Sequence, residues 1–212
     1  MTTLADRLRA EFGEIDIYLF DQLLRGRIAE GMRILDAGCG SGRNLVFLMR
    51  EGFDVSGSDE NESAIAELRR TAVALAPRLA ADHFRVERVE SMSWADASMD
   101  VVISSAVLHF ARDDAHWEVM VSEMWRVLAP GGVLFARLAT SVGQPALVPL
   151  GGNRWRLPDG SSRYLVDHAR LIDTTRALGG ELLDPVRSSV VEGLRSMGTW
   201  VVRKGGVRMR SG

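Results

Sequence analysis

The chain has 212 residues, of which 46% are hydrophobic and 25% are charged, and its formal net charge is −2. This length suits one domain, 1–212, with a single substantial core. The near-neutral charge gives no general attraction to phosphate backbones, so we expect no nucleic-acid partner. Since no apolar stretch approaches the roughly 20 residues that span a bilayer, we also expect no membrane partner.

Cys39 is the single cysteine of the chain. A lone thiol excludes an internal disulfide and suits a reducing compartment. The first residues lack the apolar core of a signal peptide. We therefore expect a cytoplasmic protein.

The N-terminal part of the chain carries apolar side chains near helical spacing, which predicts a helical segment over residues 4–30. We assign residues 1–30 to an N-terminal helical cap. The apolar positions behind this prediction are Leu8, Phe12, Ile15, Leu19, Leu23 and Leu24.

From residue 31 to 140, short apolar runs alternate with helical patterns. This alternation predicts a doubly wound α/β fold with a mainly parallel, seven-stranded sheet and helices on both faces. The almost wholly apolar run 100–104 is typical of a strand buried on both faces. We expect Pro130-Gly131-Gly132 to end the helix before the fifth strand. The expected strands of this core lie at 33–37, 53–58, 83–89, 100–104 and 133–138.

After Thr140 the alternation lapses. Residues 141–166 hold two short runs around Pro158-Asp159-Gly160, which predicts a hairpin inserted after the fifth strand. Residues 204–212 form a basic, glycine-containing end, which we expect to be a mobile tail. The elements expected in residues 167–203 are a helix at 167–178 and two closing strands at 182–191 and 199–203.

The stretch ILDAGCGSGRN, residues 34–44, places a glycine-rich loop directly after the first strand. Ligands of an open parallel sheet sit at the carboxyl ends of its strands, and glycine lets backbone approach a ligand without a Cβ in the way. The spacing Gly-x-Gly-x-Gly differs from the Gly-x-Gly-x-x-Gly of dinucleotide sites. Asp36 precedes the loop, where its charge would repel a pyrophosphate, and Asp59 ends the second strand, where two oxygens can take both ribose hydroxyls. A ligand with a ribose, a positive centre and no phosphate therefore fits better than NAD.

Four ordered segments resemble the class I S-adenosylmethionine-dependent methyltransferases over roughly residues 30–138. ILDAGCGSGRN resembles the first motif of the family, and VSGSDENESAI resembles the second. SWADASMDVVISSAVLHF resembles the run into the fourth strand, and EMWRVLAPGGVLFARL resembles the segment from helix to fifth strand. The resemblance implies a Rossmann-like fold, S-adenosyl-L-methionine as cofactor and methyl transfer to a small-molecule acceptor.

The resemblance also implies roles for the glycine loop. The backbone of Gly38, Cys39 and Gly40 would lie beside the methionine part of the cofactor. Asp36 would lie near the amino end of that methionine, and Asn44 at the end of the motif is included among the cofactor-binding residues.

Two further segments would complete the contacts to the cofactor. Asp59 would hold the ribose, with Glu60 beside it. The main chain around Ser105 and Ala106 would border the sulfonium.

One position departs from the family pattern. Related sequences usually carry an Asp after the third strand that reaches the adenine amino group, and here that position is Arg88. We expect Glu90, with the backbone of Ser91 and Met92, to take its place.

Methyl transfer needs alignment of the acceptor with the methyl group and exclusion of water. A general base is needed only where the acceptor must lose a proton. His109, just beyond the fourth strand, is the candidate for that role, and packing near the site is the alternative. We expect no metal ligands, because His83, His116 and His168 show no metal-ligand spacing and are interpreted as structural or surface residues.

The 141–166 insertion, with Trp155 and Tyr164, is expected to form a lid over the acceptor pocket, unless these two residues simply cover the edge of the sheet. A cofactor-binding module without catalysis, acting as a sensor or partner subunit, is the alternative function. A dinucleotide-dependent oxidoreductase is a third hypothesis, which the glycine spacing opposes. We expect a monomer or homodimer.

Overall fold

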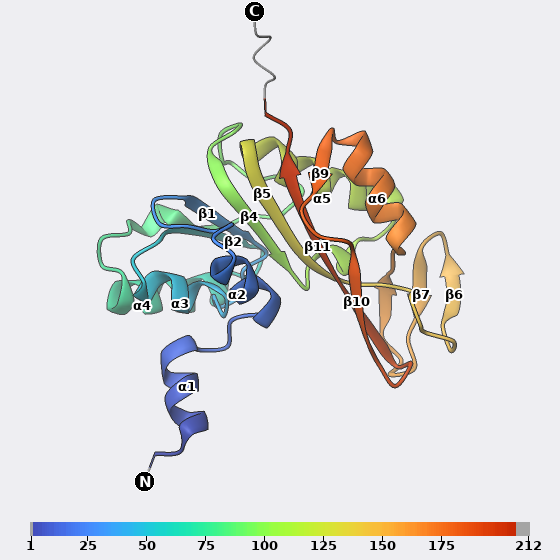
Figure 1. Ribbon diagram of the computed structural model, residues 1–212, viewed down its shortest axis with the longest axis horizontal. Helices are drawn as coiled ribbons and strands as arrows, with labels where there is room; N and C mark the ends of the chain where they lie inside the picture. The colour runs from blue at the N-terminus through green and yellow to red at the C-terminus, as the bar shows by residue number, and fades with distance from the viewer. Residues whose placement is uncertain (1, 207–212) are drawn as a thin grey trace, which may run out of the picture.

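The computed structural model describes residues 2–206 and is built around a twisted sheet with helices on both faces (Figure 1). The eight strands of this sheet run in the order β10-β11-β5-β4-β1-β2-β3, with β9 paired to β11. They are β1 (Arg33–Ala37), β2 (Asp54–Asp59), β3 (Phe84–Val86), β4 (Met99–Ser105), β5 (Leu128–Ala139), β9 (Gly180–Leu182), β10 (Arg187–Val191) and β11 (Arg195–Lys204). The predicted α/β class with a mainly parallel sheet is confirmed.

The helices divide between two hydrophobic cores. One core lies under α2, α3 and α4, and the other under α5 and α6. Neighbouring residues of β1 point into different cores, Ile34 into the first and Leu35 into the second, so both faces of this strand are buried. The helices and turns are α1 (Leu4–Phe12), α2 (Ile17–Leu24), α3 (Leu45–Arg50), α4 (Glu62–Leu75), α5 (Asp114–Val127) and α6 (His168–Ala177), with 3-10 turns η1 (Ala81–His83) and η2 (Leu108–Phe110).

Strand order reverses next to β1, which pairs in parallel with both β2 and β4. Asp36 is in register with Gly57 on one side and Ile103 on the other, so it stands in the middle of the sheet near its carboxyl edge. Where the order of an open parallel sheet reverses, the loops part and leave a crevice beyond the strand ends. This topology places the glycine loop at that crevice.

The N-terminal segment forms two helices rather than one continuous helical run. Gly13, at φ +65°, follows α1, and the side chain of Asp16 caps α2 by accepting the amide of Tyr18. None of the residues of α1 is buried, and this helix projects away from the sheet (Figure 1). Helical spacing is present on both sides of Gly13, but this glycine divides the segment into two helices.

Two other expectations about element ends were wrong. Helix α5 ends at Val127, and Pro130-Gly131-Gly132 lies inside β5 instead of stopping the helix. The closing strand expected at 182–191 is broken into β9 and β10, which both pair with β11, so the sheet has eight strands in place of seven. Pro185 lies in the break, where it cannot donate a ladder hydrogen bond.

The insertion after β5 forms a small sheet of its own, with the strand order β6-β7-β8. Its strands are β6 (Val148–Gly151), β7 (Arg154–Arg156) and β8 (Ser162–Tyr164), so the expected hairpin has a third strand. Tyr164 is buried, and its hydroxyl donates to the carboxylate of Asp114, which also accepts the side-chain amide of Asn153 at 2.7 Å. These bonds attach the small sheet to the start of α5.

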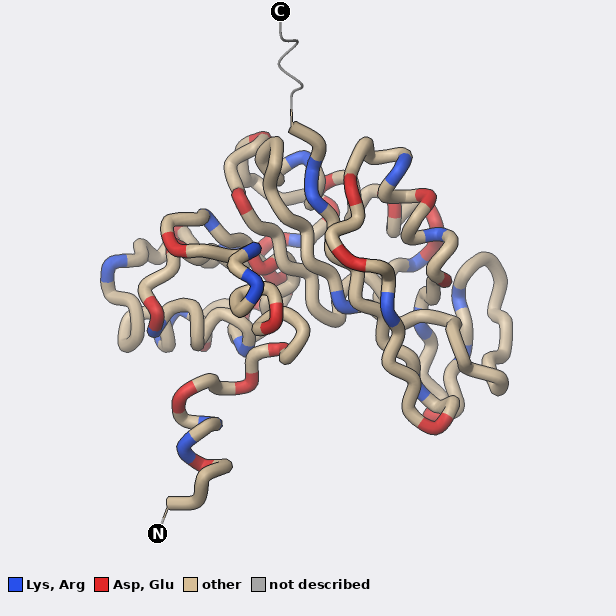
Figure 2. Tube along the Cα trace, in the orientation of Figure 1, with Lys and Arg blue, Asp and Glu red and all other residues tan. Residues whose placement is uncertain are grey.

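The C-terminal strand extends further than expected. Lys204 ends β11, and its Nζ donates to the carbonyl of Leu128 at 2.8 Å, so the expected tail does not begin at 204. Residues 207–212 of that predicted tail lie outside the described residues. Acidic and basic residues are interspersed along the trace (Figure 2). Across residues 2–206, no helix is long and apolar enough to cross a membrane.

Candidate functional site

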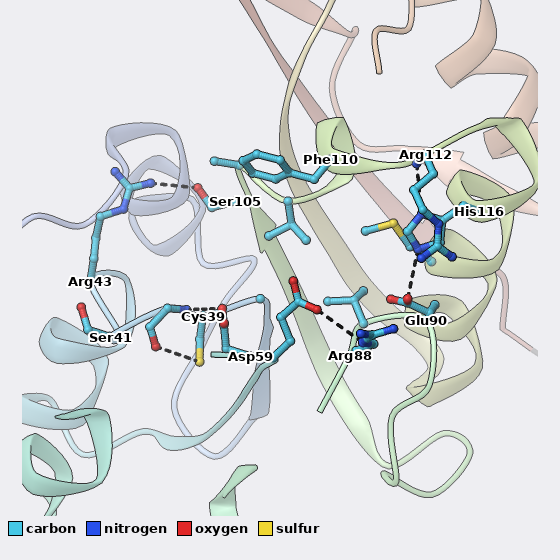
Figure 3. A pocket seen from close by; sticks show the side chains of 17 residues that line it. Cys39, Ser41, Arg43, Asp59, Arg88, Glu90, Ser105, Phe110, Arg112 and His116 are labelled. Atoms are coloured by element: carbon cyan, nitrogen blue, oxygen red, sulfur yellow. Dashed lines mark hydrogen bonds and ion pairs between the residues drawn. The ribbon is translucent and has the colours of Figure 1, made fainter. Parts of the chain in front are cut away.

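A cleft of about 790 Å³ opens at the carboxyl ends of β1, β2 and β4 (Figure 3). Its volume lies in the range of small-molecule sites. The residues that line it are Gly38, Cys39, Gly40, Ser41, Arg43, Asp59, Glu60, Arg88, Val89, Glu90, Ser105, Ala106, Val107, Phe110, Arg112, His116 and Met120.

The glycine loop forms one wall of the cleft with its backbone. Gly38 has φ +81°, and a Cβ there would stand 2.4 Å from Cγ2 of Val107, so this position requires glycine. The amides of Gly38 and Cys39 both donate to the carbonyl of Ser58, at 2.7 and 3.0 Å. The loop is therefore tied to the end of β2 and presents main chain to the cleft.

The carboxylate of Asp59 is held in place by two backbone donors. Its Oδ2 accepts the amide of Gly40 at 2.8 Å, and its Oδ1 accepts the amide of Asn61 at 2.9 Å. Each carboxylate oxygen has a further lone pair. The side chain is thus fixed beside the loop and can still accept two hydroxyl groups.

Asp36 does not line the cleft and is 1% exposed, at the end of β1. Neither of its carboxylate oxygens has a hydrogen-bond partner among residues 2–206. Burial raises the pKa of Asp36 to about 7, because desolvation disfavours the ionised form. A buried carboxyl without a partner is costly, and a cationic ligand group placed nearby would stabilise its charge.

Asn44 also lies outside the cleft wall. It is buried, and its Oδ1 accepts the amide of Asp16 at 3.1 Å. The side chain therefore joins the loop before α2 to the start of α3, whereas the sequence suggested a contact with the cofactor.

The segment after β3 forms the opposite wall, where Arg88, Val89 and Glu90 line the cleft. Arg88 Nε lies 3.4 Å from Oε2 of Glu60, and both side chains are exposed at the cleft mouth. Ser91 and Met92 do not line the cleft. The amide of Met92 instead donates to Glu123 at 2.8 Å, so this amide already has a partner.

His116 lines the cleft, which corrects its interpretation as a structural or surface residue. Its Nδ1 accepts the amide of Arg112 at 3.1 Å, which places the proton of the neutral ring on Nε2. That Nε2 lies 3.1 Å from Oε1 of Glu90 (Figure 3). The Glu90 carboxylate therefore lies beside the first turn of α5.

The end of β4 closes the cleft between these walls. Ser105 and Ala106 line it as expected, and the Ser105 hydroxyl accepts Nη2 of Arg43 at 3.0 Å. Ala106 has φ +66°, an unfavourable conformation for a residue with a Cβ, and its amide donates to the carbonyl of Arg137 at 2.8 Å. Backbone strain is thus located beside the site.

His109 is buried next to the cleft and does not line it. Its Nδ1 accepts the amide of Ala139 at 3.2 Å, and burial lowers its pKa to about 4. With Nδ1 occupied, the neutral ring carries its proton on Nε2 and has no free lone pair. This geometry favours the packing alternative over the role of general base.

The lining of the cleft includes no residue of the described insertion 141–166. Trp155 packs against the cluster of Ala139, Leu157 and Leu165, and Tyr164 is buried in the main core. The insertion approaches the cleft through Arg163, whose guanidinium lies over the ring of Phe110.

Sequence reasoning missed several lining residues from the segment between β4 and α5. Phe110 is the last residue of the fourth-strand motif and Arg112 follows it, and a loop leaving the carboxyl end of a central strand must lie at this edge. His116 and Met120 are spaced i, i+4 on α5 and so share a face. Across residues 2–206, no group of three or more His, Cys, Asp or Glu is arranged to hold a metal ion.

Comparison with known proteins agrees with this geometry. A family model described as a methyltransferase domain matches residues 35–136. A ubiquinone biosynthesis O-methyltransferase of Sinorhizobium medicae is 31% identical over 161 residues, which cover 73% of this chain and 62% of that protein. A malonyl-(acyl-carrier protein) O-methyltransferase of Enterobacter lignolyticus is 36% identical over 110 residues, which cover 50% of this chain and 39% of that protein. The matched region thus spans less than two thirds of either relative.

The fold is shared with solved structures. A SAM-dependent methyltransferase of Methanosarcina mazei superposes with a TM-score of 0.71 at 24% identity, covering 87% of this chain and 97% of that chain. The matched domain begins in β1 and ends in β5, so it contains the glycine loop, Asp59 and the end of β4. Residues 35–136 are thus similar to a methyltransferase domain, and the chain has the fold of a solved SAM-dependent methyltransferase.

Proposed function

We propose that this chain transfers a methyl group from S-adenosyl-L-methionine to a small-molecule acceptor. The observation that carries the proposal is the cleft itself, which joins a backbone-lined glycine loop, the fixed carboxylate of Asp59 and the strained end of β4. Bound there, the cofactor would supply an electrophilic methyl group on a sulfonium.

The residues present fit this cofactor. Asp59 presents free lone pairs to a ribose, and the loop backbone leaves room for an aliphatic chain. Asp36 is a buried acid without a hydrogen-bond partner among the described residues, and the α-ammonium group of the cofactor offers the positive charge that would favour its ionised form. Glu90, positioned by His116, is proposed to face the adenine amino group in place of the usual Asp.

The chain contributes alignment and exclusion of water. Ser105 and Ala106 would border the sulfonium, and Phe110 gives the neighbouring wall an apolar face against which an acceptor can pack. Holding the acceptor in line with the methyl group can supply several kcal/mol of the barrier reduction. Both curated relatives are O-methyltransferases, which supports oxygen as the first acceptor atom to test.

Isothermal titration calorimetry with S-adenosylmethionine and S-adenosylhomocysteine tests the cofactor. We expect Asp59→Ala to weaken both affinities at least about tenfold, since charge-assisted hydrogen bonds are lost. Asp54→Ala, at the opposite end of β2, is the matched control and should leave them unchanged. Absence of binding to the unmodified protein at millimolar ligand would overturn the proposal.

A screen for release of S-adenosylhomocysteine tests the reaction, with phenols and carboxylic acids first and thiols, amines and metalloid oxyanions next. Turnover with any class supports catalysis. Tight cofactor binding without turnover across all classes would favour a cofactor-binding module. A cytoplasmic location, the absence of a nucleic-acid partner, and a monomeric or dimeric state belong to the same proposal.

A further inference from the structure

Arg43 lines the cleft and forms no ion pair with any acidic residue in the described part of the chain. It stands just before α3, lines the cleft, and its Nη2 donates to Ser105 Oγ at 3.0 Å (Figure 3). Among residues 2–206 no carboxylate forms an ion pair with it, whereas Arg88 on the opposite wall lies 3.4 Å from Glu60. The guanidinium of Arg43 therefore faces the cleft with donors to spare.

Asp36 is a buried acidic side chain close enough to feel the charge of Arg43. The positive charge of Arg43 lowers the pKa of Asp36, which opposes the increase caused by burial. The two charges are not hydrogen-bonded to each other. The glycine-loop end of the site thus has a positive group in the cleft wall and a buried acidic group at the end of β1, an arrangement that complements an α-amino acid in its zwitterionic form.

We propose that Arg43, with Ser105, forms a carboxylate-binding site at the glycine-loop end of the cleft, and that this site takes the α-carboxylate of the methionine part of the cofactor. A guanidinium can grip a carboxylate with two parallel hydrogen bonds, so the site would fix the direction in which the amino-acid chain enters. The inference rests on the proposed function, because it assumes that a methionine-bearing nucleoside occupies the cleft.

A carboxylate on the acceptor is the other source of the same chemistry. Arg43 touches Ser105, which borders the expected sulfonium, so an acceptor carboxylate could also reach it. The negative charge of Asp36 favours the cofactor as the ligand, because the cofactor carries an ammonium group next to its carboxylate. An acceptor carboxylate has no such ammonium group. The test must separate the two.

The test compares two ligands that differ by the amino acid. S-adenosylhomocysteine carries the carboxylate and ammonium, and 5′-methylthioadenosine has the same adenosyl thioether without them. Calorimetric affinities of both are measured for the unmodified chain, Arg43→Gln, Arg43→Lys and the control Arg70→Gln, which removes an exposed charge on α4. Thermal unfolding of each variant confirms that it folds.

We expect Arg43→Gln to weaken S-adenosylhomocysteine about tenfold to one hundredfold, with 5′-methylthioadenosine unchanged. Arg43→Lys should recover part of the lost affinity for S-adenosylhomocysteine, because lysine keeps the positive charge but lacks the two parallel donors of a guanidinium. Arg70→Gln should change neither affinity. If Arg43→Gln weakens both ligands equally or leaves both unchanged, the cofactor assignment is overturned.

A second arm examines the acceptor. Benzoate and benzamide are titrated into the unmodified chain and Arg43→Gln, each saturated with S-adenosylhomocysteine. We expect neither probe to bind in a way that depends on Arg43. Arg43-dependent binding of benzoate alone would move the site to the acceptor and overturn the assignment to the cofactor. Failure of the unmodified chain to bind S-adenosylhomocysteine at all would instead defeat the proposed function.

Discussion

The guanidinium of Arg163, from the insertion after β5, lies 4.8 Å from the centroid of the Phe110 ring in the wall of the cleft. Phe110 is 57% exposed, which is high for a large apolar side chain in a cleft. The pair brings the small β6–β8 sheet to the place where an acceptor would enter. It is one contact through which the insertion could influence binding in the cleft.

Removal of this ring should affect the acceptor and spare the cofactor. We expect Phe110→Ala to raise the KM for the acceptor about tenfold, because an aromatic contact of roughly 1 kcal/mol and its buried area are lost. Arg163→Gln should have a smaller effect in the same direction. Steady-state kinetics and cofactor titration check both. Weakened cofactor binding with an unchanged acceptor KM would contradict the assignment.

The buried carboxyl of Asp36 should make stability depend on pH. Its folded-state pKa of about 7 lies above the ordinary value of 3.8, so the folded state holds the proton more tightly than the unfolded state. This contribution is most favourable at low pH and is lost as pH rises from about 4 to 7. Asp36→Asn should therefore raise the thermal unfolding midpoint relative to the unmodified chain at pH 8, with the difference shrinking toward pH 4.

Cofactor binding should also release a proton from the carboxyl of Asp36. If a cationic group binds beside Asp36, its pKa falls, so the affinity for S-adenosylmethionine should rise between pH 6 and pH 8. Calorimetry in buffers of different ionisation enthalpy measures the protons released. Asp36→Asn should flatten the dependence, and an unchanged pH profile in that variant would show that another group is responsible.

His109 offers a test of packing against catalysis. We expect His109→Leu to cost about 1–3 kcal/mol of stability, because the buried amide of Ala139 loses its acceptor. His109→Asn can supply an oxygen near the position of Nδ1, so it should restore much of the stability and keep turnover. A well-folded His109→Asn that binds cofactor normally but has no activity would support the role of general base.

Because Ala106 has a left-handed backbone conformation, we expect this position to tolerate glycine better than a β-branched residue. Ala106→Gly should be nearly neutral, because relief of the φ +66° strain offsets the entropy that glycine adds to the unfolded chain. Ala106→Val should destabilise the protein by about 1–3 kcal/mol, since a β-branched side chain is less compatible with this conformation. Chemical denaturation measures both, and equal losses would show that the backbone can relax.

The parts of the site that follow from the sequence are those fixed by local chemistry. The glycine loop, Asp59 and the end of β4 were predicted because the end of an apolar run locates the carboxyl end of a strand. Glycine then indicates where the backbone turns. At the opposite edge of the sheet, Asp100 near the start of β4 pairs with Arg33 at 2.9 Å.

The parts that were missed depend on packing between distant segments. His116 lines the cleft because α5 lies against the loop that carries Glu90, and nothing in its own neighbourhood indicates this. Tyr164 can be buried because its hydroxyl donates a hydrogen bond to Asp114, fifty positions earlier in the chain. β5 begins before Pro130-Gly131-Gly132 because Leu128 pairs with Met99, and the pairing with β4 resumes at Val133 after an irregularity that contains those residues.

The double attachment of Asn153 and Tyr164 to Asp114 has a consequence for how the cleft can be reshaped. Asp114 opens the helix whose next turns present His116 and Met120 to the cleft. Remodelling of the small sheet is therefore transmitted as a shift of that helix, far from the loop after β1. The shape of the cleft beside α5 can thus be altered through one peripheral module while the glycine loop and Asp59 stay constant.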